Sequence, residues 1–389
     1  MSAHSIPLPA SSPRKTRIAV AVFFFVSGFS YATWASRIPA LQQKLHLNEA
    51  QLGTTLFAMP AGLMATLPFT RYLLGKYSSR HIMLIGSIAF SLLLAMLGLV
   101  NHVWQFVAIL FLFGAARNLM NIPVNAQSIG VQTLYKRSII TSFHGIWSVA
   151  GFVAAGVGNI MISNSIPPYL HFMMAGALCL LLMALFYGNT FKNDLPSGTS
   201  EKRAAFSIPD KPLIKLGLIA FCCMACEGTM YDWSGIYFER VVAAPKSFQA
   251  LGFTAFMCAA ATGRFLGDWL VNKYGVRRML QIFGCFIAAG LTLAVALPYL
   301  VPATIGFILT GLGVSCVIPL TMSLAGQASG SQTPGQAIAS VSTVSYFGFL
   351  LGPPVIGYIA QAANLRWSFV LGALAGLCIT VLISKMRKI

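Results

Sequence analysis

The sequence contains few charged residues, and acidic residues are the scarcest among them. Charged residues make up 9% of the 389 positions, and only 8 residues are Asp or Glu. The whole stretch between Met279 and Leu365 contains no Lys, Arg, Asp or Glu. Soluble globular domains are about one-quarter charged, so this composition excludes that class of protein. Because about 20 apolar residues cross a bilayer, the uncharged stretch must contain several membrane spans divided by turns.

The predicted loops contain no cysteine, and the sequence also lacks the common catalytic motifs. All 8 cysteines fall within apolar segments, so we expect no disulfide framework. We expect the cysteines to pack as small apolar side chains. The C-x-x-C of "CCMAC" leaves a metal site as an alternative, which the lack of a nearby His disfavours. There is no H-E-x-x-H, G-x-S-x-G or phosphate-loop motif. We therefore expect no catalytic residues, no metal and no cofactor.

Apolar residues dominate what is present, at 57% of the chain with a mean hydropathy of +0.76. This composition predicts an all-α integral membrane protein with twelve transmembrane helices. The predicted spans are 18–36, 50–74, 81–100, 103–131, 139–163, 168–190, 213–238, 248–272, 277–297, 302–329, 335–362 and 366–384. A channel is a less suitable class, since two repeats around one buried site favour alternating access.

The positive charge of the chain follows the predicted loops. A net charge of +18 and a pI near 9.8 are compatible with nucleic-acid binding, but the distribution of the 26 basic residues indicates topology instead. On the side of the membrane that holds both termini there are 19 of them. The opposite side has five, which are Arg37, Lys44, Arg240, Lys246 and Arg366. Because basic loops stay in the cytoplasm, we predict a multi-pass inner-membrane protein with both termini cytoplasmic and no nucleic-acid partner.

A polar stretch, "FKNDLPSGTSEKRAAFSIPDK", divides the spans six and six. Pro, Gly, Ser and mixed charge are typical of a surface linker. "GKYSSR" and "NKYGVR", and likewise "SVAGF" and "SYFGF", recur at an offset of 197, which indicates an internal repeat. An even number of spans in each half makes the repeats parallel. The predicted organisation is a cytoplasmic tail at 1–17, a six-helix bundle at 18–190, a cytoplasmic linker at 191–211 and a second six-helix bundle at 212–389.

Several motifs resemble those of the major facilitator superfamily. The loop sequence "DWLVNKYGVRR" is similar to its basic loop signature, with Asn272 at the position of the signature Asp. "TWASRIPALQQ", "HGIWSVAG", "EGTMYDWS" and "GPPVIGYI" resemble a bacterial branch near the fucose:proton symporters. The resemblance covers essentially the whole chain. It implies that spans 1, 4, 7 and 10 line a central cavity. It also implies that Arg264, Asp268 and Lys273 belong to a conformational gate. Arg264 and Asp268 are four residues apart, a spacing that allows them to pair on one helix.

Polar residues of the fourth span share one helical face. Arg117, Asn121 and Asn125 recur every four residues in "GAARNLMNIPVNAQSIGVQ". An arginine in mid-span is costly and is expected to face a wet cavity or a partner, so we predict that this face binds substrate. An alternative is that Arg117 holds backbone carbonyls while the asparagines join neighbouring helices.

Two acidic residues interrupt the apolar seventh span, "CEGTMYDWSG". Glu227 lies about midway and Asp232 five residues further, so a regular helix would point them about 140° apart. Gly228 could loosen the turn between them. We predict that both take part in proton coupling, with Glu227 as the main carrier that alternates between pairing with Arg117 and lying neutral. A permanent structural pair of Glu227 with Arg117 is the alternative, and for Asp232 a bond to the outer end of a helix is equally open.

His144, Trp34 and Tyr231 complete the set of predicted substrate-binding residues. His144 opens "HGIWSVAG" and titrates near neutral pH, so it suits substrate binding or proton relay as well as simple packing. Trp34 and Trp233 occupy equivalent positions in the two repeats, where anchoring at the membrane interface and stacking on substrate are both open.

These features together predict a monomeric secondary transporter. We expect it to move a small polar solute, sugar-like or anionic, by alternating access, with protons as the coupling ion and the lipid bilayer as its surroundings. A proton-coupled multidrug efflux antiporter is the alternative. Drug antiporters of the superfamily carry Gly-Pro-x-x-Gly-Gly in the fifth span, whereas "GFVAAGVGNI" lacks the proline.

Overall fold

The computed structural model describes residues 12–136, 139–192, 211–328 and 334–386. All regular elements among these residues are helices. Twelve of the helical segments are long and apolar enough to cross a membrane, and each overlaps one predicted span. The prediction of an all-α protein with twelve membrane helices is therefore confirmed.

The first half of the chain, here called the N-bundle, supplies six spans. Its helices are α1 (Pro13–Ala35), α2 (Ile38–Lys44), α3 (Glu49–Leu56), α4 (Ala58–Lys76), α5 (Ser79–Leu97), α6 (Val103–Gln132), α7 (Ile140–Ser163), α8 (Pro168–Phe186) and the 3-10 turn η1 (Tyr187–Asn189). Helices α3 and α4 form one span. Helix α1 begins before the predicted residue 18 because the Ser12 side chain accepts the backbone N–H of Lys15 at 3.3 Å and Pro13 occupies the first turn.

The second half, here called the C-bundle, supplies the other six spans. Its elements are α9 (Lys211–Arg240), the 3-10 turn η2 (Lys246–Phe248), α10 (Leu251–Tyr274), α11 (Val276–Ala296), α12 (Leu300–Val314), α13 (Val317–Gln327), α14 (Pro334–Ala362) and α15 (Leu365–Ser384). Helices α12 and α13 form one span. Most of the predicted linker, residues 193–210, lies outside the described residues.

The two bundles repeat the same helix pairings. In the N-bundle α1 packs on α7, α5 on α6, α4 on α6 and α5 on α8. The corresponding pairs of the C-bundle are α9 with α14, α11 with α12, α10 with α12 and α11 with α15. Both six-helix units therefore bury their apolar surface in the same arrangement, as the parallel sequence repeat predicts.

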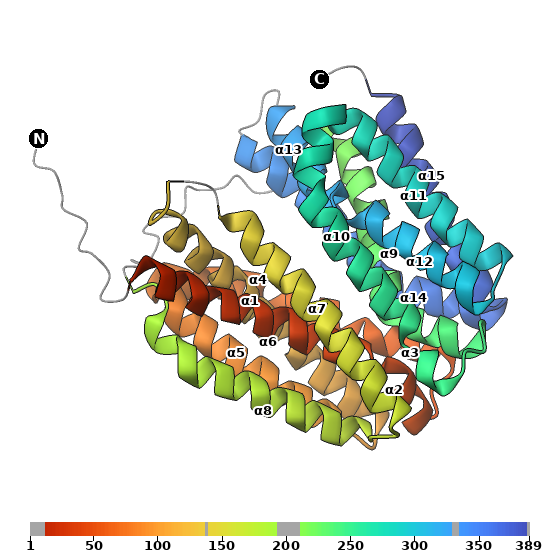
Figure 1. Ribbon diagram of the computed structural model, residues 1–389, viewed down its shortest axis with the longest axis horizontal. Coiled ribbons are helices and arrows are strands. Elements are labelled where there is room, and N and C mark those ends of the chain that lie inside the picture. Colours follow the sequence, from red (N-terminus) through yellow and green to blue (C-terminus); the bar gives the residue numbers. More distant parts are fainter. Residues whose placement is uncertain (1–11, 137–138, 193–210, 329–333, 387–389) are drawn as a thin grey trace, which may run out of the picture.

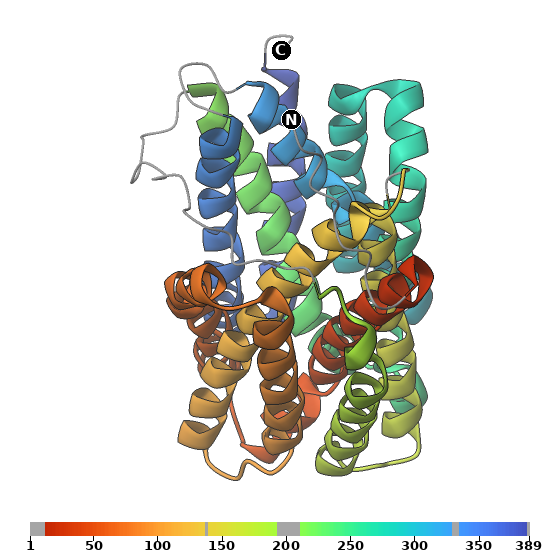
Figure 2. The same ribbon diagram turned by 90° about the vertical axis from the view of Figure 1, so that its left-hand side faces the viewer.

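The bundles are distinct groups of helices that meet at one end, here called the closed end, where α2, α3 and η2 lie (Figures 1 and 2). Helix α3 packs against α14 there, and α7 packs against α10. Polar contacts cross between the bundles at this end: an ion pair joins Glu49 to Arg240, and Lys246 donates to the Ser165 hydroxyl at 2.8 Å. The start of α1 and the end of α15 lie at the opposite end (Figure 1).

Helices α7 and α10 also stay in contact nearer the middle of the molecule. A Cβ atom added to Gly145 of α7 would lie 2.5 Å from the Phe265 ring of α10, so the absent side chain allows this approach. This pair of helices carries the polar site between the bundles.

Candidate functional site

The two acids of the seventh span lie on one unbroken helix. Helix α9 runs from Lys211 to Arg240, so the expected loosening at Gly228 does not occur. Gly228 serves packing instead, because a Cβ there would lie 3.2 Å from the Phe349 ring of α14. Glu227 and Asp232 are both buried, at 8% and 7% exposure. Since five residues of a regular helix turn about 140°, the acids meet different neighbours.

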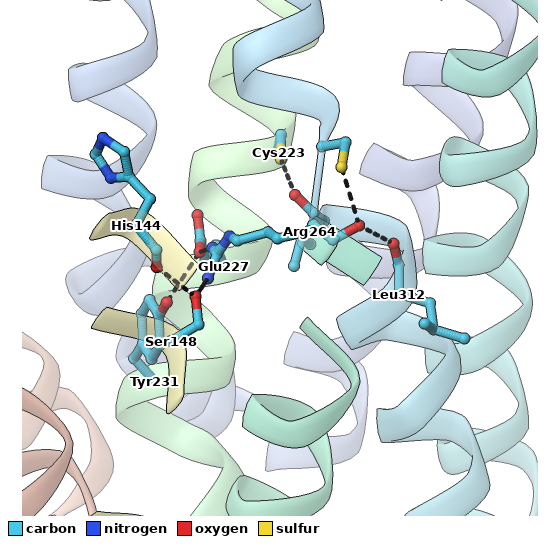
Figure 3. A network of polar contacts seen from close by, with 10 residues as sticks. His144, Ser148, Cys223, Glu227, Tyr231, Arg264 and Leu312 are labelled. Atoms are coloured by element: carbon cyan, nitrogen blue, oxygen red, sulfur yellow. Dashed lines mark hydrogen bonds and ion pairs between the residues drawn. The ribbon is translucent and has the colours of Figure 1, made fainter. Parts of the chain in front are cut away.

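Glu227 forms the centre of a polar network that joins α9, α10 and α7 (Figure 3). Its carboxylate accepts from Arg264 Nη2 and from the Tyr231 hydroxyl, both at 2.9 Å. Arg264 also donates through Nη1 to the Ser148 hydroxyl at 2.9 Å. Ser148 in turn donates to the backbone carbonyl of His144 at 3.1 Å. Because Ser148 belongs to the N-bundle, a charge-assisted chain crosses from one bundle to the other.

Arg264 is thus the cation that pairs with Glu227, and the expected pair with Arg117 is wrong for this conformation. The physical reason lies in helix packing. Helix α10 packs against α9, and the Arg264 side chain reaches from α10 to the Glu227 carboxylate on α9. Arg264 was expected to act as a gating residue with Asp268. The Asp268 side chain lies outside the described part of the chain, so that pairing stays a prediction.

Arg117 meets a different set of groups. Its guanidinium carbon lies 3.9 Å from the centre of the Tyr31 ring on α1. Tyr31 packs edge-to-face against Tyr231 of α9, with ring centres 5.1 Å apart. Asp232, the residue after Tyr231, forms no ion pair with Arg117. The Tyr31–Tyr231 contact therefore joins the bundles beside the Glu227 network, and Arg117 packs on its N-bundle ring.

The asparagines of α6 contact its own backbone and α1. Asn121 accepts a hydrogen bond from Ser27 of α1 at 2.8 Å, and Asn125 donates to the backbone carbonyl of Asn121 at 2.8 Å. Both side chains remain half-buried. The Ser27–Asn121 bond joins α1 to α6, which is the role of the asparagines that was kept open as an alternative. The exposed part of each amide stays a candidate for substrate contact.

His144 and Trp34 lie apart from the Glu227 network. The His144 ring is exposed and packs edge-to-face on Phe24 at 5.4 Å, so only its carbonyl joins the network. Trp34 is completely buried in the N-bundle, 5.6 Å from Phe106 between ring centres. Its burial contradicts both anchoring at the membrane interface and stacking on substrate in this conformation, because no surface of the ring is accessible. The indole instead fills the N-bundle core.

The predicted gating residue Lys273 lies on an exposed turn of α10. Its ammonium contacts the rings of Trp269 and Tyr274, at 5.1 and 5.3 Å from the ring centres. Both rings belong to the same helix. Its role in gating therefore stays a prediction.

Ser148 and Tyr31 are site residues that sequence reasoning missed. Ser148 lies inside the quoted motif "HGIWSVAG", four residues after His144, a spacing that places both on one helical face. Tyr31 lies two residues before the quoted motif "TWASRIPALQQ". A polar or aromatic residue within or beside such motifs was an available signal.

Two bundles of six membrane helices with a buried ionic site between them are typical of transporters that work by alternating access. The sequence profile of the Major Facilitator Superfamily matches residues 20–243 and 237–388. The chain belongs to this superfamily, and it is a multi-pass membrane transporter. The resemblance noted from its motifs is therefore confirmed.

Individual relatives agree with this assignment. An uncharacterized MFS-type transporter of Yersinia pestis is 30% identical over 368 residues, which cover 94% of each chain. The structure of the nucleoside transporter NupG superposes with a TM-score of 0.72 over 96% of this chain and 100% of that chain, at 12% identity. FucP, in the outward conformation, gives a TM-score of 0.64 over 94% of this chain and 97% of that chain, at 18% identity.

Proposed function

We propose that this transporter moves a small polar solute by alternating access and that protons drive the movement through Glu227. One observation carries the proposal: the Glu227–Arg264 ion pair is buried on membrane helices and is tied to the other bundle through Ser148. Ionisable groups inside membrane helices are costly and mark ion or substrate pathways. The names of two fold neighbours, a nucleoside transporter and a fucose:proton symporter, fit a polar cargo.

Coupling follows from what a change of conformation does to this network. When the bundles rock, α7 moves relative to α10, and the bond from Arg264 to Ser148 breaks or shifts. Arg264 is then free to move relative to Glu227. A carboxylate in a low-dielectric setting is stable beside a guanidinium, whereas the neutral acid is favoured when that cation withdraws. Conformation and proton occupancy of Glu227 are thereby linked.

Glu227→Gln tests this role directly. We expect the variant to retain exchange of substrate across proteoliposome membranes but to lose accumulation driven by a pH gradient. The amide keeps a hydrogen-bonding oxygen for Tyr231 yet cannot gain or lose a proton. The substrate for the assay is first found by ligand-induced thermal stabilisation of the purified protein with sugars, nucleosides and carboxylates.

Glu239→Gln is the matched control, because Glu239 lies on the same helix at the closed end and bonds with Gln43. It should accumulate substrate like the unmodified protein. Full pH-driven accumulation in Glu227→Gln would refute the assignment of the carrier. Asp232 would then be the next carboxyl group to test.

We also propose that the closed end faces away from the cytoplasm, with both termini in the cytoplasm of a cell whose inner membrane holds the protein. The excess of basic residues in the loops on the termini side supports this orientation. Lys44→Cys, at an exposed position of the closed end, should react with a membrane-impermeant maleimide in intact cells. A reporter fused to the C-terminus should read as cytoplasmic. An extracellular reading of that reporter would reverse the orientation.

A further inference from the structure

The two arginines in the middle of spans differ in their hydrogen bonding. Arg264 uses both terminal nitrogens, one for Glu227 and one for Ser148. Arg117 forms no hydrogen bond and no ion pair within the described part of the chain, and its Nε atom is buried without a partner. Its guanidinium packs on the face of Tyr31. The side chain is only half-buried, so donors on the guanidinium remain accessible.

Asp232 shows the same lack of partners from the opposite bundle. Its side chain is 7% exposed and takes part in no hydrogen bond or ion pair with any described residue. Asp232 directly follows Tyr231, whose ring meets Tyr31 across the bundles, and Tyr31 in turn packs under the Arg117 guanidinium. Glu227, five residues away, is by contrast fully engaged by Arg264 and Tyr231. Among the described residues in the middle of the spans, Glu227 is thus paired with Arg264, whereas Asp232 and Arg117 are not paired.

A separated pair of this kind is costly when nothing lies between its members. A buried charge without a partner costs several kcal/mol, and water offers only partial compensation in a confined space. The arginine fork has five donors whose planar geometry matches a carboxylate in a bidentate fashion. A buried carboxylate accepts from hydroxyl or ammonium groups. One small molecule that carries both kinds of group would satisfy Arg117 and Asp232 together.

We propose that Arg117 and Asp232 are the two poles of the substrate site and that the substrate is a small carboxylate that also carries a hydrogen-bond donor. This inference rests on the proposed transport function and assigns its cargo class. The acid group of the solute binds Arg117, and its hydroxyl or ammonium group binds Asp232. Tyr31 and Tyr231, which meet edge-to-face across the bundles, form a wall of the same site.

Charge and hydrogen-bond strength at the site disfavour the other cargo classes. A cation would be attracted by Asp232 but would add a like charge beside Arg117. A neutral sugar would offer Arg117 only hydroxyl acceptors, which form weaker hydrogen bonds with a guanidinium than a carboxylate does. Arg264 already neutralises Glu227. The one unpaired negative group near an anion bound to Arg117 is therefore Asp232. The hydroxyl or ammonium group of the solute donates a hydrogen bond to Asp232 and so offsets this repulsion. The selected class is therefore a hydroxy or amino carboxylate.

Binding to the purified full-length protein in detergent, at one pH and without any gradient, tests the cargo class. The probes are gluconate and lactate as hydroxy acids, serine as an amino acid, glucitol as the neutral counterpart and glucosamine as the cationic one. We expect saturable thermal stabilisation by at least one of the three acids and little by glucitol or glucosamine. Arg117→Ala should weaken the apparent affinity for that acid by about tenfold or more, the size of a lost charge-assisted pair. Asp232→Asn should weaken it severalfold.

Arg71→Ala is the matched control, since it removes an exposed arginine of α4 and should leave the affinity unchanged. Arg117→Lys keeps the positive charge but lacks the planar guanidinium, so it should bind the acid with intermediate affinity. Such binding would show that the variant is folded and that the loss in Arg117→Ala comes from the site. Equal stabilisation by glucitol, no stabilisation by any of the three acids, or unchanged affinity in Arg117→Ala would each overturn the proposal. Glu227→Gln should still bind the acid, so a failure of proton coupling and a failure of this site are distinguishable.

Discussion

Arg264→Ala is expected to destabilise the protein by about 3–5 kcal/mol and to abolish transport, because it leaves Glu227 buried without its cation. Arg264 supplies the only ion pair that Glu227 makes among the described residues, at 2.9 Å, and the carboxylate is 8% exposed. The loss should be largest at high pH and should shrink as the pH falls, since the stranded carboxyl group can then take up a proton and become neutral. Reversible unfolding in mixed micelles, followed at several pH values, measures this dependence.

The double variant Arg264→Met with Glu227→Gln provides the control. Replacing both partners removes the unpaired charge, so most of the lost stability should return, while proton-driven transport should not. If the single variant is as stable as the double variant at every pH, the ion pair contributes nothing to the fold. The cross-bundle bond to Ser148 would then be its remaining role.

The positions of the spans could be predicted closely from the sequence. Helix α6, at Val103–Gln132, was expected at 103–131, and α15, at Leu365–Ser384, was expected at 366–384. Membrane spans are unusually predictable because the thickness of the bilayer fixes their length and its interior excludes charge. The start of α1 was missed because Arg14, Lys15 and Arg17 appeared too polar for a span, yet helices extend beyond the apolar core.

The partner of Glu227 could not be predicted in the same way. Spacing along a helix indicates which residues share a face, and it correctly placed Arg117 and Asn121 on one side of α6. It does not give the rotation of that face toward a particular neighbour. Arg117 and Arg264 both lie in mid-span, and only the packing of α10 against α9 selects Arg264.

Arg37 is a second case in which tertiary packing decides. It was counted as a loop charge on the side opposite the termini, but its side chain is 3% exposed and donates to the backbone carbonyl of Ile166. Burial lowers the pKa of Arg37 to about 10, so it stays charged at neutral pH. The arginine therefore ties the end of α1 to the turn before α8, a role that topology counting cannot distinguish from solvent exposure.

Gly53→Leu is expected to prevent the closed end from forming and to reduce transport by at least about tenfold. Helices α3 and α14 approach there backbone to backbone. A Cβ on Gly53 would lie 2.5 Å from the Pro353 carbonyl oxygen and 3.0 Å from the Gly357 Cα, and one on Gly357 would lie 2.5 Å from the Glu49 carbonyl oxygen. Because backbone atoms cannot rotate away as side chains do, the bundles must separate at this end.

The clash is expected to move the conformational equilibrium rather than unfold the helix. Leucine favours helix over glycine by about 1 kcal/mol, so α3 itself should persist. About 5.5 kcal/mol takes a two-state equilibrium from 1:99 to 99:1, which a backbone overlap of this size can supply. Spin labels at Asn101→Cys and Tyr299→Cys, in a background lacking the exposed Cys258, Cys285 and Cys378, should report a longer distance between the bundles.

Gly75→Leu is the matched control, because it lies in the same span and a Cβ there meets nothing within 4 Å. It should leave both the label distances and transport unchanged. Gly357→Leu should reproduce the effect of Gly53→Leu from the other side of the contact. An unchanged distance distribution together with normal transport in Gly53→Leu would show that α3 and α14 need not meet this closely. The alternating movement would then have to close elsewhere, along the α7–α10 contact that carries Arg264 and Ser148.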